Sequence, residues 1–344
     1  MTTSGVNPSP APQASDQPVP SISVVVPVYK EEANIVPFLK RTEAVLVELG
    51  EPYEIIFALD PSPDNTEGVV VEQIARNPSI KLLVFSRRFG QPAATMAGIL
   101  SCTGRTCVAI DVDLQDPPEL IASLYQKLKE GYEVVYAKRR SRKGETLVKR
   151  LISYVGYAII NRTSEVRIPT NTGDFRIMTR RVVEELRRLN ESHGFLRGLV
   201  PYVGFKQAFV EYDRDARFAG KGNYNRLTGS LKIGFNGIVS FSGRPLQMMS
   251  VVGFIVSLFS FALGAWYVIQ KFVLGVDLTP GLSTTVLVVS FFSGVQLLGL
   301  GLLGEYVGRI YDEVKRRPLF IVDKKVNFKS DEAATEAGLS ERHR

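Results

Sequence analysis

The sequence contains very few of the residues that build disulfide frameworks or histidine-based sites. It has two cysteines and two histidines among 344 residues. A single pair, Cys102 and Cys107, cannot form the set of bridges that stabilises small secreted domains, so a reducing cytoplasmic environment fits better. The scarcity of histidine argues against a histidine-rich metal site and against a histidine-based catalytic triad.

The N-terminus lacks the apolar run of a signal peptide. Residues 1–20 are instead rich in Pro, Ser, Ala and Gln, a composition typical of disordered segments. We therefore expect a disordered tail over residues 1–20 and the start of the fold at Ser21.

Acidic residues are in the minority, and the formal net charge is +7. Such a charge suits nucleic acid, anionic lipid or a phosphorylated substrate as a partner. Mean hydropathy is +0.04, which is high for a soluble globular protein. Much of the basic surplus flanks two long apolar runs near the C-terminus, so we expect no nucleic-acid partner.

These two runs are long enough to cross a membrane. Residues 245–270 and 278–304 contain no Asp, Glu, Lys or Arg, and a bilayer core of about 30 Å needs about 20 residues. Basic residues precede the first run and follow the second, namely Arg226, Lys232, Arg244, Arg309, Lys315, Arg316 and Arg317. The positive-inside rule therefore predicts a multi-pass protein of the inner (cytoplasmic) membrane, with both termini and residues 21–225 in the cytoplasm.

The segments around this hairpin are expected to be simpler. Residues 226–244 mix Lys232 with apolar residues at helical spacing, which predicts an amphipathic helix in the membrane interface; an ordinary packed helix is the alternative. The hairpin itself is assigned to residues 245–310. Residues 311–344 are predicted to be a cytoplasmic segment that ends in a polar tail. Small residues in the second run permit close packing within one chain or in a homo-oligomer, so the oligomeric state stays open.

Between residues 21 and 225, short apolar runs alternate with amphipathic stretches. The predicted strands are Ile22–Val26, Tyr53–Leu59, Ile80–Phe85, Thr106–Ile110, Glu133–Ala137, one that follows Asn171, and Gln207–Tyr212. The predicted helices are Asn34–Leu49, Glu67–Ala75, Pro92–Leu100, Pro118–Glu130, Thr146–Ile160 and Arg180–Leu189. This alternation predicts an α/β domain with a mostly parallel sheet.

Three carboxylates crowd together where the fourth predicted strand ends. Asp111, Asp113 and Asp116 lie within six residues, and such groups repel one another unless a cation or hydrogen-bond donors offset the charge. Asp60 ends another strand, and parallel sheets bind ligands beyond the carboxyl ends of their strands. We therefore predict a Mg²⁺ or Mn²⁺ site at Asp111 and Asp113. Asp116 precedes Pro117 and is expected to cap a helix.

A basic segment, residues 138–143, follows the next strand at the same predicted edge of the sheet. A solvated charged run is the plain interpretation, but this position favours anion binding. Carboxylates for a cation, a basic run and a membrane anchor together suggest transfer of a group from a nucleotide diphosphate to a molecule in the membrane.

The ordered motifs resemble those of the polyprenyl-phosphate glycosyltransferases of glycosyltransferase family 2. The resemblance covers roughly residues 21–325, and rests on Val26-Pro27-Val28-Tyr29-Lys30-Glu31-Glu32, Asp111-Val112-Asp113-Leu114-Gln115-Asp116-Pro117-Pro118-Glu119, Tyr136-Ala137-Lys138-Arg139-Arg140-Ser141-Arg142, Asn171-Thr172-Gly173-Asp174-Phe175-Arg176 and Gly304-Glu305-Tyr306-Val307-Gly308-Arg309. It implies a GT-A fold, a UDP- or GDP-sugar donor such as UDP-glucose, and a polyprenyl phosphate acceptor such as undecaprenyl phosphate.

The resemblance also implies roles for individual residues. The nucleotide pocket would be lined by Pro27, Tyr29, Glu31 and Asp60. The metal and donor diphosphate would be held by Asp111, Asp113 and Gln115. Asp174 matches a proposed catalytic base, although a lipid phosphate is already ionised near neutral pH and Asp174 could instead orient the sugar. Phosphate contacts are expected from Arg139, Arg142, Arg176 and Lys221, with salt bridges as the alternative.

One departure from the family pattern concerns donor choice. Where the family usually has Asn-Asp-Gly-Ser, this chain has Leu59-Asp60-Pro61-Ser62. Pro61 fixes φ and removes a backbone donor, which bears on base or sugar specificity more than on reaction class. The alternatives are a non-catalytic lipid-binding or scaffold protein and a processive polysaccharide synthase. The second usually has a Gln-x-x-Arg-Trp motif, and the only tryptophan, Trp266, lies in the first apolar run.

Overall fold

The computed structural model describes residues 20–140, 169, 171–189, 196–213, 243–274 and 281–328. Residues 1–19 of the predicted tail over residues 1–20, the predicted helix Thr146–Ile160 and most of the predicted amphipathic helix lie outside these ranges. The same is true of Arg142 and Lys221, two of the predicted phosphate contacts.

An eight-stranded sheet forms the centre of the α/β domain, with the order β7-β5-β6-β4-β1-β2-β3-β8. Its strands are β1 (Ile22–Val28), β2 (Tyr53–Leu59), β3 (Ile80–Phe85), β4 (Thr106–Ala109), β5 (Val134–Arg139), β6 (Thr172–Thr179), β7 (Gln207–Tyr212) and β8 (Val322–Val326). The inner strands β4, β1, β2 and β3 are parallel, whereas β6 and β8 run antiparallel to their neighbours. The predicted mostly parallel α/β fold is therefore confirmed.

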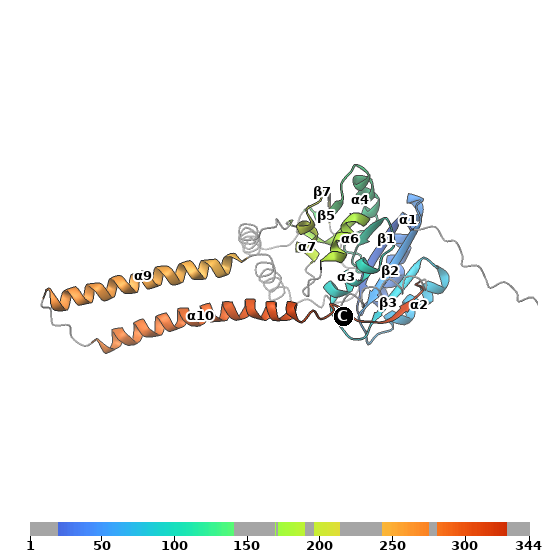
Figure 1. Cartoon of the computed structure of the whole chain (residues 1–344). Coiled ribbons are helices and arrows are strands. Elements are labelled where there is room, and N and C mark those ends of the chain that lie inside the picture. The colour runs from blue at the N-terminus through green and yellow to red at the C-terminus, as the bar shows by residue number, and fades with distance from the viewer. Residues whose placement is uncertain are drawn as a thin grey trace, which may run out of the picture.

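Helices cover both faces of this sheet (Figure 1). They are α1 (Glu32–Leu49), α2 (Thr66–Arg76), α3 (Gln91–Ser101), α4 (Leu120–Lys129), α6 (Arg180–Arg188) and α7 (Leu196–Val203). Alternation along β1 places Val24 and Val26 in the apolar core beneath α1 and α4, and Val25 in the core beneath α3 and α6. Burial on both faces explains why the β1 sequence is a continuous apolar run.

Strand β8 joins the sheet from the far end of the sequence. It pairs antiparallel with β3 and forms the edge of the sheet, and the Ile321 carbonyl accepts a hydrogen bond from the Ser86 backbone N–H at 3.0 Å. The ring of Phe320 lies 5.9 Å from that of Phe85, centroid to centroid. The predicted domain boundary at residue 225 therefore leaves out a strand, because this segment returns only after the second long apolar helix.

We expect Phe320→Ala to lower stability by about 2 kcal/mol, because it removes a partly buried aromatic ring from the contact between β3 and the returning segment. Thermal unfolding of the detergent-solubilised full chain measures the change. Ile321→Ala is the matched control, since that side chain is 50% exposed. Equally small changes in melting temperature for both variants would contradict the prediction that this segment stabilises the domain.

A buried carboxylate links the N-terminal ends of β1, β2 and β3. Glu54 of β2 forms an ion pair of 2.8 Å with Lys81 and accepts hydrogen bonds from Ser23 and Thr103. Burial by itself would raise the pKa of Glu54, but Lys81 and the hydrogen bonds hold that pKa below its ordinary value. Glu54 therefore stabilises the fold above its unfolded pKa, and this stabilisation is lost as the pH falls through the lower folded pKa.

Because the pKa of Glu54 is lowered in the folded protein, we expect Glu54→Gln to be less stable than wild type near neutral pH. The difference should shrink as the pH falls below the ordinary glutamate pKa of about 4.3, and it should vanish once the pH is below the lowered pKa of the folded wild-type carboxyl group. Unfolding curves of both proteins at a series of pH values measure it. A difference that stayed constant with pH would contradict the ion pair as its source.

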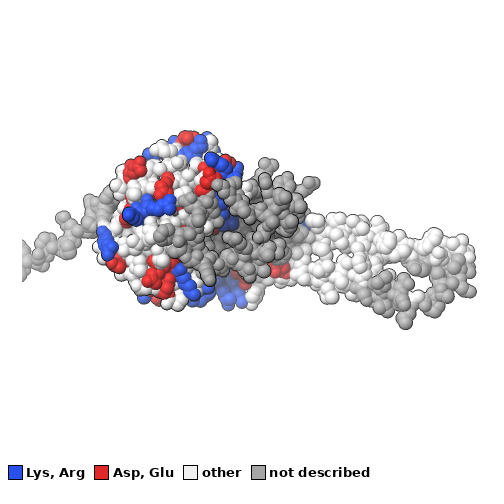
Figure 2. Space-filling model, turned by 180° about the vertical axis from the view of Figure 1, so that it is seen from behind, with Lys and Arg blue, Asp and Glu red and all other residues white. Residues whose placement is uncertain are grey.

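Two long helices extend away from the α/β domain, α9 (Arg244–Phe272) and α10 (Leu282–Val314) (Figure 1). By length and composition, Arg244–Trp266 and Phe291–Val314 are apolar enough to cross a membrane. Large apolar side chains lie exposed along them, for example Phe254 at 70% and Phe261 at 78%. Figure 2 shows few charged side chains on these helices and both signs of charge on the α/β domain.

Candidate active site

The predicted metal motif forms a tight turn just after β4. The strand ends at Ala109, and the chain turns back at Leu114, whose φ is +59°. The backbone N–H of Gln115 donates a hydrogen bond of 3.1 Å to Oδ1 of Asp113. A left-handed conformation is unfavourable for leucine and persists only where the surroundings enforce it, often at functional sites. Here it closes the short loop that carries both Asp111 and Asp113.

Negative charge accumulates around Asp111. Burial, together with Asp174, Asp116 and Asp113, raises the pKa of Asp111 to about 8. The side-chain amide of Gln91 donates a hydrogen bond of 2.8 Å to Asp111 Oδ1. We name Asp111, Asp113, Asp116 and Asp174 the carboxylate cluster. Sequence reasoning placed three of these side chains together, and the structure adds Asp174 from the distant strand β6.

Asp174 is bound by an arginine that the sequence did not single out. Arg197 of α7 donates from Nε to Oδ1 at 3.0 Å and from Nη2 to Oδ2 at 3.1 Å. Burial would raise the pKa of Asp174, but Arg197, Arg176 and Arg139 hold that pKa below its ordinary value. Asp174 is therefore an ionised carboxylate held in a fixed plane.

Arg176 lies inside the domain. Its side chain is only 1% exposed, and it donates to the backbone carbonyls of Gly173 at 3.0 Å, Asp174 at 3.1 Å and Leu196 at 3.3 Å. These contacts favour a structural role over the phosphate contact expected from the sequence, because its donors are directed at backbone carbonyls and at the Asp174 carboxylate.

Asp116 does not cap a helix, so that prediction was wrong. Helix α4 begins at Leu120 after Glu119, without a side-chain cap in the described part of the chain. The carboxylate of Asp116 accepts a hydrogen bond from the Tyr212 hydroxyl and forms an ion pair of 3.5 Å with Arg139. A buried carboxylate gains more from a cation and a hydroxyl than from one backbone N–H.

Arg139 is held at the rim of the cluster. Its Nε donates to the Tyr212 hydroxyl at 3.2 Å, and its side chain is 18% exposed. A Cβ on Gly173 would lie 2.8 Å from the Arg139 guanidinium, so glycine makes room for this arginine. Arg139 therefore combines a fixed position with access to a ligand.

The residues predicted to line the nucleotide pocket meet at the ends of β1 and β2. Tyr29 and Glu31 follow β1, Pro27 pairs with Ala58 of β2, and Asp60 follows β2 directly. The two carboxylate oxygens of Asp60 accept hydrogen bonds from the backbone N–H groups of Phe89 and Gly90, at 2.9 and 2.8 Å.

The loop after β3, which contains Phe89 and Gly90, also contacts Tyr29. The guanidinium of Arg88 lies 3.9 Å from the centre of the Tyr29 ring. In the segment after β2, the hydroxyl groups of Ser62 and Thr66 accept hydrogen bonds from the backbone N–H groups of Lys30 and Glu31, at 3.0 and 3.1 Å. Pro61 thus lies in a loop fastened to the segment after β1, where it can affect the shape of a nucleotide pocket.

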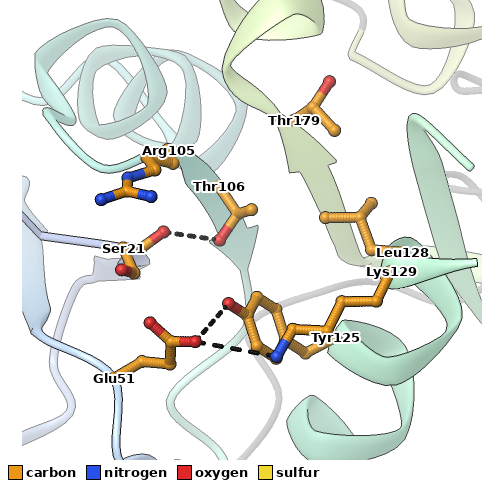
Figure 3. Close-up of a pocket in the computed structure, with 8 residues that line it drawn as sticks. All are labelled: Ser21, Glu51, Arg105, Thr106, Tyr125, Leu128, Lys129 and Thr179. Atoms are coloured by element: carbon orange, nitrogen blue, oxygen red, sulfur yellow. Dashed lines mark hydrogen bonds and ion pairs between the residues drawn. The ribbon is translucent and has the colours of Figure 1, made fainter. Parts of the chain in front are cut away.

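A separate hollow of about 400 Å³ lies at the opposite edge of the sheet (Figure 3). It is lined by Ser21, Glu51, Arg105, Thr106, Tyr125, Leu128, Lys129 and Thr179. Glu51 accepts a hydrogen bond from Tyr125 at 3.0 Å and pairs with Lys129 at 3.7 Å. Because β1 and β4 begin here, this hollow is remote from the carboxylate cluster at their other ends.

Comparison with known proteins identifies the family. Residues 23–187 match the model of "Glycosyl transferase family 2". An uncharacterized glycosyltransferase of Synechocystis sp. is 44% identical over 88% of this chain and 94% of its own length. This chain belongs to glycosyl transferase family 2.

Other relatives of this glycosyltransferase have more specific names. The SfII prophage-derived bactoprenol glucosyl transferase of Shigella flexneri is 40% identical over 88% of this chain and 97% of its own length. The prophage bactoprenol glucosyl transferase homolog of Escherichia coli is 36% identical, with 88% and 98% covered. The predicted family and the enzyme class are therefore confirmed.

Sequence reasoning missed two side chains of this candidate site. Arg197 lies in a short helix that contains both Gly198 and Pro201, so no helical periodicity marked the segment. Tyr212 ends a strand that was predicted, yet a terminal aromatic residue on an edge strand gives no sign of its hydroxyl partner. Among the described residues, no group of three or more His, Cys, Asp or Glu side chains is arranged to hold a metal ion by itself.

Proposed function

We propose that this glycosyltransferase moves a sugar from a nucleoside diphosphate sugar, such as UDP-glucose, to a membrane polyprenyl phosphate, such as undecaprenyl phosphate. The observation that carries the proposal is the carboxylate cluster at the carboxyl edge of the parallel strands, with Arg139 and Arg197 against it. Relatives named bactoprenol glucosyl transferases support the lipid acceptor and the sugar.

The two long helices support a lipid acceptor. Exposure of their apolar side chains to water would be unfavourable, whereas the interior of a membrane would accommodate them. With α9 and α10 in the inner membrane and the α/β domain in the cytoplasm, a water-soluble donor and a membrane-held acceptor meet at the site. Positioning the two reactants in this way is itself a large part of catalysis.

The cluster suits a hard divalent cation. Mg²⁺ is usually bound through one or two protein carboxylates together with substrate phosphates, and Asp111 and Asp113 would supply two oxygen ligands where negative charge is in excess. Gln115 follows on the same turn and is retained as a further candidate ligand. When bound there, Mg²⁺ or Mn²⁺ would stabilise the charge of the departing diphosphate.

The remaining residues bind and orient the substrates. Pro27, Tyr29, Glu31 and Asp60 would form the nucleotide pocket, and Arg139 would contact phosphate. From the sequence alone, Arg142 and Lys221 are further candidates for phosphate contacts.

The transfer itself is a single displacement with inversion. A phosphate oxygen of the lipid attacks the anomeric carbon, and the bond from that carbon to the diphosphate oxygen breaks. The acceptor is already ionised and Asp174 is a weak base, so Asp174 would orient the sugar rather than remove a proton.

A transfer assay tests this function. Full-length protein in detergent, with UDP-[¹⁴C]glucose, undecaprenyl phosphate and Mg²⁺, is expected to give label in the organic phase. Excess EDTA should abolish the signal and added Mg²⁺ or Mn²⁺ should restore it. Transfer that persists unchanged after exhaustive chelation would contradict the metal-dependent mechanism. Absence of transfer from a panel of UDP- and GDP-sugars would contradict the proposed reaction.

A further inference from the structure

Arg197 and Asp174 form a closed unit with the first turn of α7. Arg197 donates a hydrogen bond to each carboxylate oxygen of Asp174, at 3.0 and 3.1 Å. Arg176 completes the unit from the interior, because it contacts Asp174 Oδ1 at 3.4 Å and the Leu196 carbonyl at 3.3 Å. The same buried guanidinium thus holds the carboxylate and the start of the helix that carries Arg197.

This unit joins one member of the carboxylate cluster, Asp174, to helix α7 on the side of the domain that faces the long helices. Figure 1 shows α7 on that side, and Asp174 is the second cause, after burial, of the raised pKa of Asp111. The side chains of Arg197 and Asp174 are 31% and 22% exposed. The pair is therefore partly accessible from solvent.

We propose that Arg197 is a positioning residue for sugar transfer, which fixes the plane and direction of the Asp174 carboxylate so that Asp174 can accept hydrogen bonds from the sugar. The inference rests on the proposed function, in which Asp174 contacts the donor sugar. A two-point contact prevents rotation of the carboxylate. Oδ1 accepts from both Arg197 and Arg176, whereas Oδ2 accepts from Arg197 and keeps a further lone pair for a hydroxyl group.

Lysine cannot replace this arrangement fully. Its ammonium group is a single point charge, whereas the guanidinium is a planar fork that matches a carboxylate. The charge of the unit would survive in Arg197→Lys, but the fixed plane would not. The two variants Arg197→Ala and Arg197→Lys therefore separate charge from orientation.

The test is a double-mutant cycle on the full-length protein in detergent. We expect Arg197→Ala to lower kcat roughly 10- to 100-fold, the scale of a misplaced reacting group, with a smaller change in the KM for the donor. Arg197→Lys should recover part of that loss. Because the two residues act as a unit, Arg197→Ala combined with Asp174→Asn should be no slower than the slower single variant.

Arg188→Ala is the matched control, since that arginine is 75% exposed on α6. Equal transfer rates for Arg197→Ala and this control, or losses that multiply in the double variant, would overturn the inference. Thermal unfolding of each variant separates a misfolded protein from a misplaced carboxylate. If wild type fails to use lipid phosphate, the proposed acceptor fails; the same cycle is then measured on UDP release by donor hydrolysis, which needs no lipid.

Discussion

Asp113→Ala is expected to lower sugar transfer by at least about a hundredfold, the scale on which loss of one charge-stabilising group acts. Asp113 is 8% exposed, accepts a hydrogen bond from the Gln115 backbone, and contributes to the charge around Asp111. Its removal would take one oxygen ligand from the proposed cation. Initial rates of labelled-sugar transfer at saturating UDP-glucose and Mg²⁺ measure the effect.

Two further variants make this result specific. Asp113→Asn keeps an oxygen that can accept the Gln115 hydrogen bond, so the turn should survive while the charge is lost. It should be nearly as inactive as Asp113→Ala. Asp323→Asn on the exposed surface of β8 is the control for removal of one acidic charge. Full activity of Asp113→Asn would show that Asp113 shapes the turn and does not bind the cation.

Asp116→Ala is expected to destabilise the domain by about 3 kcal/mol, because it leaves the positive charge of Arg139 without its buried partner. A helix cap, the role predicted from the sequence, would contribute only about 1 kcal/mol. The side chain of Asp116 is 1% exposed and also accepts the Tyr212 hydroxyl. Denaturant unfolding of the detergent-solubilised chain distinguishes the two values.

The partners of Asp116 provide the comparison. Tyr212→Phe removes only the hydroxyl hydrogen bond and should cost about 1–2 kcal/mol, less than the loss of the carboxylate. Asp213→Ala is the control, because that side chain is 65% exposed. If Asp116→Ala were no more destabilising than the control, the ion pair with Arg139 would not be a stabilising contact.

Much of the fold could be predicted from local pattern. The apolar runs of β1, β2 and β3 are buried on both faces, so composition alone marked them within a few residues. Strand β8 could not be predicted, because its sequence Val-Asp-Lys-Lys-Val has exposed charges and stabilisation comes from pairing with β3. Helix α10 continues ten residues beyond the apolar run that predicted it, since its last turns are polar.

The candidate site was predictable only where its residues are close in sequence. Asp111 and Asp113 share one turn, and Asp60 follows a recognisable strand. The grip of Arg197 on Asp174 joins residues 23 positions apart, and the contact between Asp116 and Tyr212 joins residues 96 positions apart. Arg176 was expected at phosphate, yet its burial could be recognised only once β6 was placed inside the sheet.

Transfer to lipid phosphate is tested by a comparison of acceptors that differ only at the phosphate. Full-length protein is given UDP-[¹⁴C]glucose, Mg²⁺ and either undecaprenyl phosphate, undecaprenol or no lipid. We expect label in the organic phase with undecaprenyl phosphate alone, because the attacking atom is a phosphate oxygen. Equal labelling of undecaprenol, or labelled glucose released to water at the same rate with and without lipid phosphate, would contradict it.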